Sequence, residues 1–122
     1  MDDVLVVLVA VFFLGMGVLG LARPRTLIAP FGITLGSGEA RTEVRAVYGG
    51  FGVAMAALLA YAAATHGGSR TGIVLTVAAA LAGMAFGRLV SRAADKPAAF
   101  YPIWFYFWVE LVGAAVLVAA LL

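Results

Sequence analysis

Glu110 is the side chain whose type and position most clearly predict chemistry in this sequence. It is the one formal charge between Pro97 and Leu122, in a stretch of aliphatic and aromatic residues with one glycine and one proline. Placing an ionisable group inside an apolar membrane helix costs free energy, so such a group usually faces a partner. Its default interpretation is a role in binding or proton handling. We therefore predict a binding or proton-handling role for Glu110, with a purely structural bond between helices as the alternative.

Two polar stripes supply the partners that Glu110 needs. Arg45 and Tyr48 recur at helical spacing on one apolar segment, on the same face as Gly49 and Gly52. Tyr106 shares a helical face with Glu110 on the last apolar segment. A carboxylate buried without a partner tends to take up a proton, whereas arginine stays charged. If the stripes face each other, Arg45 and Tyr48 approach Glu110, and Arg88 competes for the same carboxylate.

Each of these polar residues also has a simpler interpretation. Arg45 and Arg88 lie near enough to a helix end to reach the membrane surface instead of forming an internal pair. Glu43 fits a solvated helix start, Tyr48 a hydrogen-bonded core phenol, and His66 a solvated turn. The predicted ligand-binding or intramembrane polar cluster consists of Glu110, Arg45, Tyr48, Arg88, Tyr106 and Glu43.

Several kinds of chemistry have no residues to support them. The chain has no cysteine and a single histidine, so a thiolate or histidine-cluster metal site is not expected. Its serines, Ser37, Ser69 and Ser91, fall at expected helix ends or loops, so no nucleophile–base pair is apparent. We predict no catalytic residues, no metal and no cofactor, and lean against an enzyme.

The composition is that of an integral membrane protein. Hydrophobic residues make up 65% and charged residues 11% of 122 residues, with a mean hydropathy of +1.11. About four spans of about 20 apolar residues fit this length. We predict a single domain, residues 1–122, an all-α antiparallel up-down four-helix bundle with spans at about 4–22, 43–65, 71–91 and 98–122.

The basic residues predict the orientation of the spans. Arg70 falls at one membrane face and the other seven of the eight basic residues at the opposite face. Basic loops stay in the cytoplasm. We therefore predict a multi-pass protein of the cell (inner) membrane with both termini on the extracytoplasmic side. Orientation also explains the pI of 9.4 better than nucleic-acid binding does.

Small residues are expected to hold the helices together, because lipid gives apolar helices no reason to associate. The packing positions predicted from the sequence are Gly49, Gly50, Gly52, Gly83, Gly87 and Gly113. Gly83 and Gly87 form a GxxxG pattern, which fits packing inside the bundle or, alternatively, a dimer face.

The segment Glu43-Val44-Arg45-Ala46-Val47-Tyr48-Gly49-Gly50 carries a family resemblance, supported by the proline-containing connection 23–35 and the late Glu110. The chain resembles a bacterial four-helix membrane family known as domain-of-unknown-function family 4345. In broad architecture it is also similar to DoxX-like membrane proteins, some of which support redox or quinone-linked systems. The resemblance implies the four-helix architecture and assigns no reaction.

Three functions follow from these observations. The first is binding of a lipid or hydrophobic small molecule in a pocket within the bundle, with Glu110, Arg45 and Tyr48 on its wall. The second is a structural or accessory subunit of a larger membrane complex. The third is a small proton-coupled transporter acting as an oligomer. The expected partners are membrane lipids, a hydrophobic ligand, and a second copy or another membrane protein, with no nucleic acid.

Overall fold

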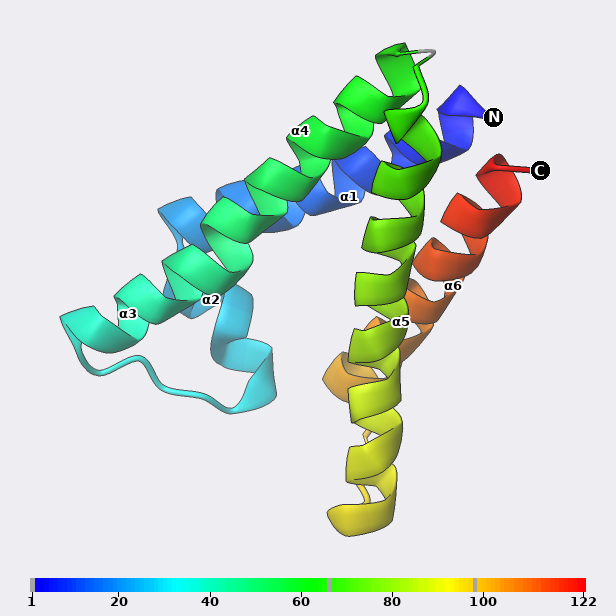
Figure 1. Ribbon diagram of the computed structural model, residues 1–122. Helices are drawn as coiled ribbons and strands as arrows, with labels where there is room; N and C mark the ends of the chain where they lie inside the picture. Colours follow the sequence, from blue (N-terminus) through cyan, green and yellow to red (C-terminus); the bar gives the residue numbers. More distant parts are fainter. Residues whose placement is uncertain (1, 66, 98) are drawn as a thin grey trace.

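The computed structural model describes residues 2–65, 67–97 and 99–122, and every regular element in these ranges is helical (Figure 1). The antiparallel all-α fold predicted from the sequence is confirmed. The helices are α1 (Asp3–Ala22), α2 (Pro24–Ile28), α3 (Gly38–Val44), α4 (Phe51–Ala64), α5 (Ser69–Ala94) and α6 (Phe105–Ala120). A 3₁₀ turn, η1 (Ala29–Phe31), and two π-helical turns, η2 (Arg45–Gly50) and η3 (Phe100–Trp104), connect or extend them.

Among the described residues, four helices are long and apolar enough to cross a membrane. They are α1, the continuous helix Gly38–Ala64 formed by α3, η2 and α4, then α5, and the helix Phe100–Ala120 formed by η3 and α6. Only 28–33% of the most apolar part of each is buried inside the chain. The remaining apolar surface faces outward, as lipid-facing helices require, which supports a multi-pass membrane protein.

Local chemistry explains where the helices begin and turn. Asp2 caps α1 by accepting bonds from the backbone N–H groups of Val4 and Leu5. The Ser37 hydroxyl accepts from the N–H of Ala40 and caps α3. Gly32 ends η1 with φ +74°, a left-handed conformation that favours glycine.

The helices are arranged as two antiparallel pairs. Figure 1 shows α1 beside α4 and α5 beside α6, and the two pairs converge near the chain termini and diverge toward the opposite end. We call the first the termini end, where Asp2, Asp3 and Arg70 lie. We call the second the arginine-rich end, where Arg23, Arg25, Arg41, Arg45, Arg88 and Arg92 lie.

The α1–α4 pair is a contact between backbones. A Cβ added at Gly52 would come within 2.8 Å of the Gly17 Cα, and one added at Gly20 within 2.8 Å of the Gly49 backbone nitrogen. Such close approach is what glycines at a membrane helix contact provide. In the other pair, a Cβ on Gly113 would lie 3.2 Å from a Leu81 methyl group. Gly49, Gly52 and Gly113 therefore lie at helix contacts.

Gly50, Gly83 and Gly87 do not lie at such contacts. All three are exposed, and nothing lies within 4 Å of a Cβ built at Gly83 or Gly87. The physical reason is rotational: α5 turns a different set of residues inward, namely Val74, Val77, Ala78, Leu81 and Ala85. The packing inside the bundle expected of the GxxxG pattern is thus not observed, and its use as a dimer face stays a prediction.

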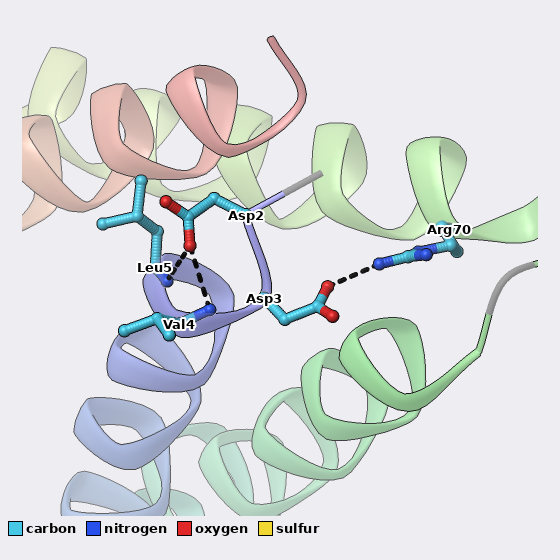
Figure 2. A network of polar contacts seen from close by, with 5 residues as sticks. All are labelled: Asp2, Asp3, Val4, Leu5 and Arg70. Carbon is cyan, nitrogen blue, oxygen red and sulfur yellow. Dashed lines mark hydrogen bonds and ion pairs between the residues drawn. The ribbon is translucent and has the colours of Figure 1, made fainter.

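The termini end is tied together by polar contacts. Figure 2 shows the Arg70 guanidinium directed at the Asp3 carboxylate, an ion pair between α5 and α1. The backbone N–H of Asp2 also donates to the backbone oxygen of Ala120 at 2.7 Å. These contacts join the first helix to both members of the second pair. His66, predicted as a solvated turn residue, lies outside the described residues.

The main apolar core fills the termini half of the bundle. Its fully buried residues include Val6, Phe13, Leu59, Leu81 and Leu117, one or two from each long helix. A second, smaller cluster lies at the arginine-rich end and consists of Leu27, Ile28, Leu35 and Val44. This cluster anchors α2 and the following connection against α3, and so places η1 between the two helix pairs.

Candidate functional site

Glu110 on α6 forms a bidentate ion pair with Arg88 on α5. The Arg88 Nε donates to Oε2 at 2.9 Å, and Nη2 donates to Oε1 at 2.7 Å. Glu110 is only 3% exposed, and the Arg88 side chain is 22% exposed. Two parallel bonds of this kind give the strongest and most directional pairing between these groups. Arg45 and Arg88 were both candidate partners of Glu110, and in the structure the partner is Arg88.

Two aromatic rings close around the Arg88 guanidinium. The ring of Phe31, in η1, stacks on that of Tyr106 with centroids 5.5 Å apart and planes at 28°. The Arg88 Cζ lies 5.9 Å from the Phe31 centroid and 5.8 Å from that of Tyr106. A cation within about 6 Å of a ring centroid is attracted by the ring. The connection after α2 therefore covers the ion pair through Phe31.

Helical periodicity explains why Arg88 and Glu110 meet. Arg88 follows the buried Leu81 by seven residues, and Glu110 precedes the buried Leu117 by seven, which is two turns in each case. Both charged residues therefore continue the inward faces of their helices. Between them lie Ala85 and Ala114 at buried positions. These small residues leave room for the two helices to approach to the distance that a side-chain ion pair spans.

Arg88 also lines a cavity of about 430 Å³ at the arginine-rich end. Its other lining residues, from α5 and the segment leading into α6, are Met84, Gly87, Ser91, Asp95, Pro97 and Ile103. The indole N–H of Trp104 donates to the backbone oxygen of Pro97 at 2.9 Å, which ties this segment to η3. The cavity thus combines an arginine, a hydroxyl and a carboxylate with the apolar side chains of Met84 and Ile103. Gly87, expected at a helix contact, lies on this wall instead.

Arg45, Tyr48 and Glu43 are not brought to Glu110. The Arg45 Nε donates to the backbone oxygen of Leu21 at the end of α1, at 3.1 Å. Tyr48 is 37% exposed, and Glu43 is exposed on α3. The helix that carries them packs mainly against α1, whereas α6 packs mainly against α5. The pocket wall predicted from Glu110, Arg45 and Tyr48 is therefore not formed.

A π-helical turn explains why the predicted stripe on this helix divides. Buried positions run from Val44 to Gly49, a step of five residues, and then to Gly52 and Ala56 at ordinary α-helical steps. A π-helix bonds residues i and i+5, so positions before and after it lose the α-helical register. Gly49, Gly52 and Ala56 therefore face α1, whereas Tyr48 faces outward.

Sequence reasoning missed three residues of this site. Phe31 was placed in a connection, and its only sequence signal is an aromatic ring between Pro30 and Gly32. Ser91 and Asp95 lie near the end of α5, where polar residues are ordinary. Tyr106, by contrast, was predicted beside Glu110, and the structure places its ring against Arg88.

The arrangement suits non-covalent binding. Arginine has five N–H donors, and the pair with Glu110 uses two of them. The carboxylate holds the guanidinium in one orientation, and the remaining donors form no further hydrogen bond within the described residues. In the part of the chain that the structure describes, no group of three His, Cys, Asp or Glu side chains is placed to hold a metal ion.

Comparison with known proteins gives the family and nothing finer. Neither the curated proteins nor the solved structures contain a match to this chain. One family model, described as Domain of unknown function (DUF4345), matches residues 1–121. With four candidate membrane-spanning helices and a match over nearly its whole length, the chain belongs to the DUF4345 family.

Proposed function

We propose that this protein binds a lipid or other amphipathic small molecule in the cavity beside Arg88. One observation carries the proposal: Arg88 is held by the buried Glu110 and at the same time lines a cavity of about 430 Å³ with polar and apolar walls. Small-molecule sites are cavities of about this size with a few fixed polar groups on apolar walls. A guanidinium already held in place loses little freedom when a ligand binds.

The lining residues favour a particular kind of head group. Arg88 and Ser91 offer hydrogen-bond donors, while Asp95 places a carboxylate on the same wall. That carboxylate disfavours a multiply charged anion, so the ligand's polar end is a carbonyl, a hydroxyl or a single carboxylate. Met84 and Ile103 then contact the apolar part of the ligand, which continues into the surrounding lipid.

The test is native mass spectrometry of the protein extracted gently from its own membrane. We expect a co-purifying molecule on the wild type that is lost in Glu110→Gln, which weakens the hold on Arg88, and in Gly87→Leu, which fills the cavity. Gly87 has no atom within 4 Å of an added Cβ, so the new side chain starts in open space and we expect the fold to be retained. Glu43→Gln, an exposed carboxylate outside the cavity, is the matched control. The same bound species on all four proteins would refute the proposal.

A structural or accessory subunit is the second candidate. The observation that favours it is that Arg88 and Glu110 satisfy each other within the chain, as a pair that only sets helix register would. In that case the wild type and Glu110→Gln are both free of small molecules. A membrane-protein partner in fixed stoichiometry is then retained on the wild type and on Gly87→Leu.

A further inference from the structure

Four arginines converge on one pocket at the arginine-rich end. Arg23 and Arg25 flank the start of α2, and Arg41 and Arg45 lie on α3 and η2. Together with Pro24 and Thr26 they line a cavity of about 420 Å³. Half of the eight basic residues of the chain therefore surround a single concavity.

The arginines of this pocket form no ion pair within the described residues. The ion pairs within residues 2–65, 67–97 and 99–122 join Arg70 to Asp3 and Arg88 to Glu110, and none includes a pocket arginine. Glu39 and Glu43 on α3 are exposed and do not line the pocket. A concave surface lined by one sign of charge concentrates the field and attracts counter-ions.

The fold holds these arginines together. The backbone contact between Gly20 and Gly49 brings the end of α1 against η2, so the segments that carry Arg23 and Arg45 lie side by side. The bond from the Arg45 Nε to the Leu21 oxygen orients that guanidinium and leaves its terminal amino groups for other acceptors. Buried Leu27 and Ile28 anchor α2 beside them.

We propose that this pocket binds a phosphate group. Phosphate has several acceptor oxygens and at least one negative charge, and the planar guanidinium fork matches it with two parallel bonds. The pocket borders Ala22, where the first membrane-spanning helix ends. The phosphate therefore belongs to an anionic phospholipid head group or to a soluble phosphorylated molecule. This site goes beyond the function proposed above and shares no residue with the Arg88 cavity.

The two sources can be separated by titration of the purified full-length chain in an uncharged detergent. Thermal unfolding, followed by tryptophan fluorescence, is measured with inorganic phosphate, with phosphatidylglycerol and with zwitterionic phosphatidylcholine. Stabilisation by phosphatidylglycerol alone identifies a lipid head group, and stabilisation by inorganic phosphate as well identifies a soluble ligand. A wild type that neither anion stabilises more than phosphatidylcholine does would overturn the proposal.

The residue test uses Arg25→Gln/Arg41→Gln, because neither side chain donates a hydrogen bond within the described residues. We expect its affinity for the stabilising anion to fall by at least about tenfold, since a hydrogen bond to a charged group is worth roughly that much. The control is Arg92→Gln/Lys96→Gln, which removes the same charge from exposed positions outside the pocket. Equal losses in both double variants would refute a built site.

A second double variant keeps the test decisive if the glutamine variant does not fold. Arg25→Lys/Arg41→Lys preserves the charge and removes the fork, so we expect weaker anion binding than in the wild type. Unchanged binding would show general charge attraction and overturn the proposal. None of these substitutions changes Arg88 or Glu110. A negative result for the phosphate pocket therefore does not decide whether the Arg88 cavity binds a ligand, which its own experiment tests.

Discussion

Replacing Glu110 by leucine removes one half of a bidentate ion pair and leaves the Arg88 guanidinium between α5 and α6. Glu110 is 3% exposed and accepts both bonds from Arg88, at 2.9 Å and 2.7 Å. Arginine cannot shed its charge, so the remaining guanidinium must either stay unpaired or move toward the membrane surface. The cost is therefore the cost of an uncompensated charge and not of a single lost contact.

The structure sets the size of this cost. Breaking a buried pair by removing one partner costs about 3–5 kcal/mol. Because 22% of the Arg88 side chain is exposed, it can rotate toward its cavity, and we expect about 2–3 kcal/mol for Glu110→Leu. Removing both charges in Arg88→Met/Glu110→Leu leaves no unpaired charge. The free energy of unfolding of the double variant should therefore lie within about 1 kcal/mol of that of the wild type.

The assay is reversible unfolding in mixed detergent micelles, followed by far-ultraviolet circular dichroism, on the wild type, both single variants and the double variant. The four free energies of unfolding give the coupling between the two side chains. A double variant as unstable as Glu110→Leu would refute the reasoning, because the loss would not come from an unpaired Arg88. So would a single-variant loss no larger than an average membrane hydrogen bond, about 0.6 kcal/mol.

Three further predictions test other contacts of the fold. Gly52→Val should lower the free energy of unfolding by at least about 2 kcal/mol in the same assay, because the valine side chain would meet the α1 backbone. The control Gly83→Val should lower it by less than about 0.5 kcal/mol. Equal losses in the two variants would contradict the packing described. Asp3→Asn should lower stability by less than about 1 kcal/mol at low salt, because the Asp3 side chain is 47% exposed, and a larger loss would show that this pair secures the termini end. Tyr106→Leu should release Phe31 and so increase the rate of proteolysis in the connection between α2 and α3. Tyr48→Leu, at an exposed position, should leave that rate unchanged. Equal cleavage rates in the two variants would argue against the ring stack.

Much of the architecture was predictable because it rests on local properties. A mean hydropathy of +1.11 with 11% charged residues leaves no alternative to apolar helices of membrane-spanning length. The Ser37 cap was predictable because a hydroxyl at that position satisfies a free backbone N–H. The inward position of Glu110 was predictable because an exposed carboxylate in lipid is costly.

The composition of the site was less predictable because it depends on helix register and on which helices pair. A pattern based on α-helical spacing assigned Arg45 and Tyr48 to the face of Gly49 and Gly52, but the π-helical turn η2 separates them. The GxxxG pattern contains glycines in the right spacing, yet it does not specify the face that a neighbouring helix covers. That choice depends on the apolar positions of α5 as a whole.

By itself, the sequence determined the class of protein, the existence of its membrane-spanning helices and the need of Glu110 for a partner, because hydropathy and the cost of a buried charge act within one segment. Only the tertiary structure decided that this partner is Arg88, that Phe31 covers the pair, and that four arginines share one pocket. Those results follow from close backbone contact between α1 and the helix Gly38–Ala64 and from the separate pairing of α5 with α6. Contacts between distant segments decide them, and no spacing along a single segment encodes such contacts.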